Sequence, residues 1–133
     1  MVILFDRFNL PEDVFEIIFA TKQQVIVAKL LIDMMKDKEG EITKTEMSFF
    51  ATQLHEGKLI TDKVMDEPYR GKKVKISYNK RQFYDRILTP MKSMGVIDYD
   101  LYRKTYKLSD KFNKEMTMIG LMWVQELRKG PYK

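Results

Sequence analysis

Apolar residues recur at the spacing of a helix in five parts of the chain. A residue that can begin a helix precedes each part: Pro11, Thr21, Thr43, Asn79 and Ser109. Glycines close the second, third and fourth parts, as is common just past a helix C-terminus, and the fifth part runs to about Arg128. The pattern therefore predicts five helices, the first of which is short and carries Phe15, Ile18 and Phe19.

Short stretches between these helices favour strands. Val96–Tyr99 and Thr105–Leu108 are joined by the polar segment Asp100–Lys104, which predicts a β-hairpin. Ile42 is an isolated apolar residue that predicts one ladder position of a further short strand. Apolar and polar residues also alternate over Val74–Tyr78, at the end of the 21-residue segment 58–78. The beginning of that segment suits a helical turn or an extended chain equally, and its middle is predicted as a loop.

The helix that begins at Asn79 has two different faces. Phe83, Ile87, Met91 and Met94 share one face, and Pro90 should kink the helix or separate its last turn. At about 100° per residue, the opposite face carries polar side chains. They are Arg81, Gln82, Asp85, Thr89 and Lys92. Their donors and acceptors suit base edges and phosphates in a DNA major groove.

Charge is distributed unevenly along the chain. The net charge is +5, yet residues 70–107 carry 11 Lys and Arg against 3 acids, whereas residues 1–69 carry 8 against 13. A local basic excess of this size is typical of a surface that binds a polyanion. A solvated basic face with no ligand would have the same composition.

Composition narrows the class of protein. A chain of 133 residues, with 44% hydrophobic and 32% charged residues, is long enough for one packed domain. Cysteine is absent, which excludes disulfides, thiolate metal sites and thiol nucleophiles. The sequence carries neither a signal-peptide pattern nor a run of about 20 apolar residues. We therefore expect a cytoplasmic protein, associated with the nucleoid if it binds DNA, and no contact with a membrane.

The order helix, short strand, helix, helix, hairpin, long helix resembles a winged-helix DNA-binding domain of the MarR or PadR type. The resemblance rests on Phe83, Ile87 and Leu88 in the helix, on Met94–Ile97 before the hairpin, and on Tyr106–Lys111 after it. It implies a mostly α fold with a small β-hairpin wing. One departure is that the family joins its second helix and its reading helix by a short turn, whereas the segment 58–78 separates them here.

The resemblance implies one domain over residues 1–133. Its parts would be an N-terminal helical arm at 1–20, a winged-helix core at 21–109 with an insertion at 58–78, and a C-terminal dimerisation helix at 110–129.

The resemblance and the charge together predict a protein that binds double-stranded DNA. The helix that begins at Asn79 is the expected reading element, because such helices present their first turn to the bases. Basic residues at the hairpin tip are expected to reach the minor groove or its phosphates, although charge there also protects an edge strand from aggregation. The basic residues of the insertion are expected to contact the DNA backbone. The candidate DNA-binding residues are Lys80, Arg81, Gln82, Asp85, Thr89, Lys92, Tyr102, Arg103, Lys104, Lys107, Lys72, Lys73 and Lys75.

The last predicted helix is apolar nearly all round in its middle, so it must be covered on more than one side. The N-terminal segment of the same chain could cover it alone. We expect instead a homodimer through this helix and the N-terminal arm, which is also what the MarR resemblance implies and which would match a palindromic DNA site. The candidate dimer-interface residues are Phe112, Met116, Met118, Ile119, Leu121, Met122, Trp123 and Val124.

The sequence does not favour an enzyme. His55 has no second histidine for a metal site, the serines lack a nucleophile motif, and no Gly-rich phosphate loop is present. We expect no catalytic residue, cofactor or metal. Two alternatives to a regulator that binds duplex DNA remain open. One is a winged-helix protein–protein interaction module in a replication or transcription assembly, which the insertion favours. The other is binding of RNA or single strands through Tyr99, Tyr102 and Tyr106.

Overall fold

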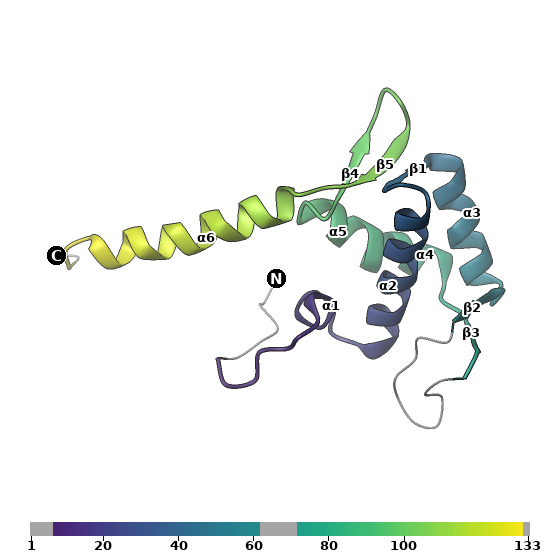
Figure 1. The fold of residues 1–133 in the computed structure, drawn as a ribbon, viewed down its shortest axis with the longest axis horizontal. Coiled ribbons are helices and arrows are strands. Elements are labelled where there is room, and N and C mark those ends of the chain that lie inside the picture. The colour runs from purple at the N-terminus through teal and green to yellow at the C-terminus, as the bar shows by residue number, and fades with distance from the viewer. Residues whose placement is uncertain (1–6, 62–71, 132–133) are drawn as a thin grey trace.

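The computed structural model describes residues 7–61 and 72–131. Within these ranges the chain is mostly helical, with short antiparallel strands (Figure 1). The elements in chain order are α1 (Val14–Ile18), α2 (Lys22–Asp37), β1 (Glu41–Thr43), α3 (Lys44–His55), β2 (Leu59–Thr61), β3 (Val74–Ile76), α4 (Lys80–Phe83), the π-helical turn η1 (Tyr84–Leu88), α5 (Thr89–Ser93), β4 (Ile97–Asp100), β5 (Thr105–Leu108) and α6 (Lys111–Arg128). The prediction of a mostly α chain with a β-hairpin is confirmed at this level.

Two small sheets are present in the described residues. The predicted hairpin forms as β4 and β5, and β1 adds to it as a third antiparallel strand in the order β1-β5-β4. Ile42 pairs with Tyr106 across the β1–β5 ladder, which confirms the strand predicted around Ile42. The second sheet consists of β2 and β3, so the start of the segment 58–78 is extended rather than helical. The loop predicted around Pro68 and Gly71 lies outside the described residues.

One hydrophobic core joins the helices to the three-stranded sheet. It is formed by buried side chains of α2, α3 and the helix 80–93, together with inward-facing residues of the sheet. Its largest fully buried members are Phe83, Leu31, Met35, Ile42, Met47, Leu54, Ile87, Leu88, Met91, Ile97 and Val27. Phe50 of α3 and Phe83 of α4 lie with their ring centroids 5.5 Å apart. The core therefore fixes α4, η1 and α5 against α2 and α3.

Most of the predicted helix starts are confirmed by their caps. The side chains of Thr21, Thr43 and Asn79 each accept a hydrogen bond from a backbone N–H three residues later. The prediction that Pro11 lies in the first turn of the first helix is wrong. That helix, α1, begins at Val14, because the carboxylate of Asp13 accepts the hydrogen bond of the Phe15 N–H at 2.9 Å.

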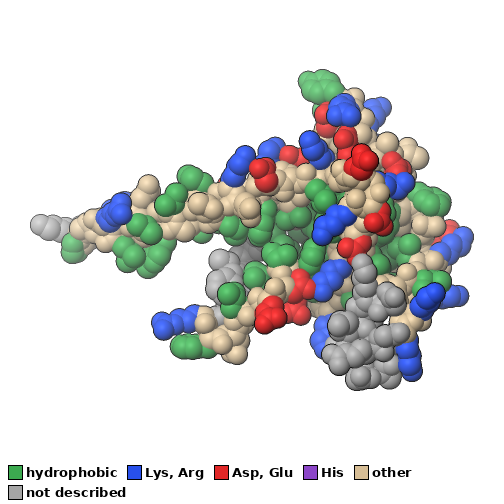
Figure 2. All heavy atoms as spheres, in the orientation of Figure 1, with side chains coloured by type: hydrophobic (Ala, Val, Ile, Leu, Met, Phe, Trp, Pro, Cys, Tyr) green, Lys and Arg blue, Asp and Glu red, His purple; other side chains and the backbone are tan. Residues whose placement is uncertain are grey.

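The last helix extends away from the rest of the molecule. Its start is anchored, since the Phe112 N–H donates to the Gly95 oxygen at 3.1 Å and Lys111 pairs with Asp98 at 2.9 Å. Gly95 has a φ of +82°, and a Cβ there would lie 3.0 Å from the Phe112 nitrogen, so this close approach requires glycine. Beyond the anchor α6 has no buried residue, and Figure 2 shows hydrophobic side chains on both of its edges.

Among the described residues, no helix has both the length and the hydrophobicity that a membrane span requires.

Candidate nucleic-acid interface

The helix 80–93, formed by α4, η1 and α5, is held at its N-terminus by α3. Asn79 caps it by accepting from the Gln82 N–H at 3.1 Å. The Nδ1 atom of His55, the last residue of α3, accepts from the Lys80 N–H at 3.1 Å. The Lys80 ammonium donates to the Thr52 hydroxyl at 3.0 Å. Lys80 is therefore turned back onto α3, apart from the other predicted DNA-binding residues of this helix.

The outer face of this helix is polar, as its periodicity predicts. Five of the side chains assigned to it are exposed: Arg81, Gln82, Asp85, Thr89 and Lys92. Arg81 and Asp85 lie 3.9 Å apart in an exposed pair, a contact that contributes little and leaves both side chains able to exchange partners. On the opposite face Phe83, Ile87 and Met91 are fully buried and Met94 is partly buried, so the core fixes which side of the helix faces outward.

Pro90 shapes the middle of the helix. The Thr89 N–H donates to the Tyr84 oxygen five residues earlier, which is a π-type hydrogen bond, and Pro90 then begins the last turn without an N–H of its own. Pro90 was predicted to kink the helix or to separate its last turn. The structure has a π turn before it instead, and α4, η1 and α5 follow one another without a gap, so the last turn is not separated.

Arg86 is also exposed, on the side of the helix where Gln82 lies one turn earlier. The predicted outer face left Arg86 out, although at about 100° per residue it lies about 100° from Ile87, so the periodicity itself could have found it.

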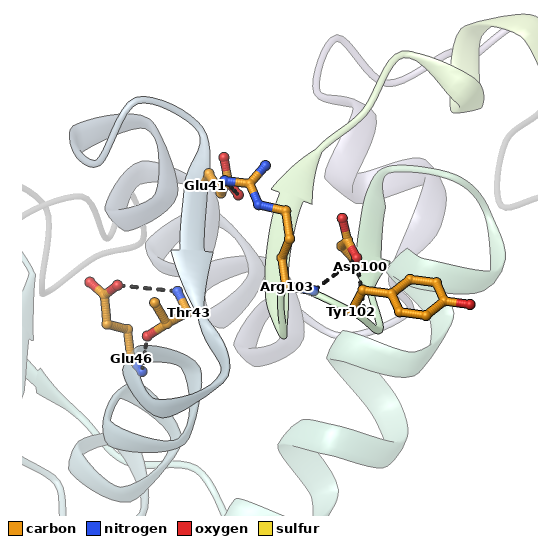
Figure 3. Close-up of polar contacts among 6 residues, drawn as sticks. All are labelled: Glu41, Thr43, Glu46, Asp100, Tyr102 and Arg103. Carbon is orange, nitrogen blue, oxygen red and sulfur yellow. Dashed lines mark hydrogen bonds and ion pairs between the residues drawn. The ribbon is translucent and has the colours of Figure 1, made fainter.

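Polar contacts of Asp100 and Arg103 tie the tip of the β4–β5 hairpin to the backbone and to β1 (Figure 3). One carboxylate oxygen of Asp100 accepts hydrogen bonds from the backbone N–H groups of Tyr102 and Arg103. The Arg103 guanidinium turns back and lies 3.3 Å from the Glu41 carboxylate on β1, while the Tyr102 ring points away and is 95% exposed. Lys104 adopts a φ of +54° and is exposed. Tyr102 and Lys104 are therefore the predicted tip residues that are directed to solvent.

Two other predicted residues lie around the same hairpin. The Lys92 ammonium lies 5.8 Å from the centroid of the Tyr99 ring, which connects the outer face of the helix to β4. Lys107 is exposed on the central strand β5, in register with Glu41 on one side and Asp98 on the other. Those two acids reduce the positive potential around Lys107.

The tyrosines of the hairpin do not form a stacking surface. Tyr106 is buried, and the half-buried Tyr99 stacks on it with a centroid distance of 4.6 Å. Burial raises the pKa of the Tyr106 hydroxyl, with smaller contributions from Tyr84 and Tyr99. Only Tyr102 of the three is free to meet a nucleic-acid base.

The second sheet carries the remaining basic candidates. Lys75 is exposed on β3, and Lys72 and Lys73 are exposed just before that strand. Arg70, which the sequence places in the same cluster, lies outside the described residues. Because β2 follows α3 and β3 precedes Asn79, this pair of strands stands directly between the two helices and at the N-terminus of the helix 80–93.

The part of the chain that the structure describes contains no group of three or more His, Asp or Glu side chains that could hold a metal ion. His55 is used instead as a backbone acceptor at the start of the helix 80–93. The outer face of the helix 80–93 offers hydrogen-bond donors and positive charge on an outward surface.

Comparisons of this chain with models of known protein families, with curated proteins and with solved structures found no match.

Proposed function

We propose that this chain is a winged-helix protein that binds double-stranded DNA with sequence preference, as a homodimer that regulates transcription. In this assignment the helix 80–93 enters the major groove, the β4–β5 hairpin is the wing, and α6 is the dimerisation helix. The β2–β3 pair is then an insertion between α3 and the reading helix, in the place that a short turn occupies in MarR-type proteins.

The observation that carries the proposal is the two-faced helix 80–93. Phe83, Ile87 and Met91 are fully buried, while the outer face presents polar groups that make no strong contact with the rest of the described chain. When such a helix lies in a major groove, the donors and acceptors of its outer face can reach the base edges. Exposed lysines supply positive charge for phosphates. They are Lys104 at the hairpin tip and Lys72, Lys73 and Lys75 on and before β3.

The homodimer is supported by the exposure of α6. Eight large apolar side chains on this helix are between 39% and 65% exposed, among them Val124, Trp123 and Leu127. In the N-terminal segment, Phe19 is buried in the core and Phe15 and Ile18 pack against it, whereas Phe8 and Leu10 are 83% and 60% exposed. A helix of 18 residues is about 27 Å long, so α6 offers an extended apolar surface to a second copy of the chain.

The test is duplex binding measured by gel shift from low to moderate salt. We expect affinity to fall steeply with salt, by close to one power of the salt concentration per phosphate contact. Arg81→Ala should reduce discrimination between sequences, whereas Lys104→Ala should weaken binding to all sequences alike. Arg103→Ala should have a smaller effect than Lys104→Ala, because the Arg103 guanidinium already pairs with Glu41.

Lys36→Ala provides the matched control, since Lys36 is an exposed lysine at the end of α2 that is remote in sequence from every candidate residue. No shift with any duplex at low salt would contradict the proposal. It would favour a protein–protein interaction module, for which the exposed apolar face of α6 would be the docking surface.

A further inference from the structure

Arg86 lies on the outer side of the helix 80–93. At about 100° per residue it stands about 100° from Ile87, the centre of the buried face, and on the same side as Gln82. The two residues that follow it, Ile87 and Leu88, are 0% and 1% exposed, so the core lies on their side of the helix. Arg86 itself is exposed.

Of the two arginines of this helix, Arg86 is the one whose guanidinium has no ion-pair partner among the described residues. Arg81 lies 3.9 Å from Asp85, and the Lys80 ammonium bonds to Thr52. Gln82 precedes Arg86 by one turn and is also exposed, so the two side chains are neighbours on one side of the helix. A planar guanidinium and a side-chain amide thus stand next to each other near the middle of the proposed reading helix.

We propose that Arg86 is a guanine-reading residue. Its guanidinium donates two parallel N–H bonds to the O6 and N7 atoms of one guanine in the major groove, and Gln82 meets the neighbouring base pair. The fork geometry of arginine matches those two acceptors, which no other base presents together, while lysine offers only a single point charge. This inference rests on the proposed DNA binding and adds one feature to it: the bound half-site contains a guanine whose selection depends on Arg86.

The first experiment is selection of duplexes from a random pool by the full chain and by three variants. Arg86→Ala removes the guanidinium, and Arg86→Lys keeps the charge but removes the fork. Lys36→Ala removes one exposed positive charge elsewhere. We expect the full chain and Lys36→Ala to select the same site. Arg86→Ala and Arg86→Lys should both lose the preference for guanine at one position of each half-site and keep the preferences at the others. Circular dichroism melting verifies that the variants fold, and the exposure of Arg86 predicts unchanged melting.

The second experiment identifies the atoms involved. The selected guanine is replaced by 7-deazaguanine, which lacks the N7 acceptor, and affinity is measured by fluorescence anisotropy. We expect a loss of about 10-fold or more for the full chain and no loss for Arg86→Ala, because one good bidentate pair discriminates on that scale.

The possible outcomes separate this inference from the proposed function. A full chain that selects a site together with an Arg86→Ala variant that selects the same site would overturn the role of Arg86 and leave DNA binding standing. An Arg86→Ala variant that binds every sequence more weakly, with the guanine preference intact, would make Arg86 a phosphate contact and would also overturn it. A full chain that binds no duplex would overturn both.

Discussion

At the scale of single residues, the ends of the helices are determined by short-range contacts. Thr43 and Glu46 form a complete capping box, in which the Thr43 hydroxyl accepts from the Glu46 N–H and the Glu46 carboxylate accepts from the Thr43 N–H. Glu46 also pairs with Lys38 at 2.9 Å, which links the start of α3 to the end of α2. Because such contacts join residues close in sequence, the sequence predicts them well.

Replacing Glu46 should change how stability depends on pH. The hydrogen bond from Lys38, followed by the one from the Thr43 backbone N–H, lowers the pKa of the Glu46 carboxyl below its ordinary value. A lowered pKa in the folded state contributes stability that is present above the unfolded pKa of about 4.3 and is lost as pH falls through the folded value. We expect Glu46→Gln to melt at a lower temperature than the parent at pH 7.

The difference between Glu46→Gln and the parent should shrink as the pH is lowered below about 4. Thermal melts followed by circular dichroism between pH 7 and pH 3 measure it. Glu12→Gln is the control, because Glu12 is an exposed glutamate for which the described residues contain no ion pair. A difference that stays constant down to pH 3 would show that the ionised form of Glu46 contributes nothing.

At the scale of the elements, prediction succeeded where the signal is local and failed where it is not. The helices and the hairpin follow from periodicity, caps and glycines. The pairing of β2 with β3 could not be predicted, because a three-residue strand carries little pattern and its partner lies across the segment 62–71. The π turn could not be predicted either, since it depends on how Ile87 and Leu88 pack against the core together with the missing N–H of Pro90.

Pro90→Ala tests whether the proline maintains the π turn. An alanine restores an N–H that can donate to the Arg86 oxygen, so we expect a more regular α-helix in which Thr89 and Lys92 turn relative to Arg81 and Gln82. The variant should then lose part of its sequence discrimination while keeping comparable affinity for non-specific duplexes. The measurement is anisotropy with a selected duplex and a scrambled one. Full retention of discrimination would show that the outer face does not depend on Pro90.

At the scale of the whole molecule, the helix α6 projects from the rest of the described chain, and its apolar side chains are exposed there. Met116 and Leu121 lie on nearly opposite sides of this helix, and each is about half exposed, at 43% and 50%. A helix that carries apolar side chains on both sides is stable in water only when other surfaces cover both sides. The sequence predicted this apolar helix correctly, while the identity of what covers it is a property of an assembly and stays a proposal.

The most direct test of the account is sedimentation of the protein with a selected duplex. We expect the free protein to have a sedimentation mass of twice its chain mass of 15.9 kDa, and the complex to hold two chains per duplex. Trp123→Glu places a charge in the proposed interface and should give a monomer with weakened DNA binding, whereas Gln125→Glu, which adds a charge at an exposed polar position of the same helix, should remain dimeric. A protein that sediments at 15.9 kDa beside free duplex would contradict the account.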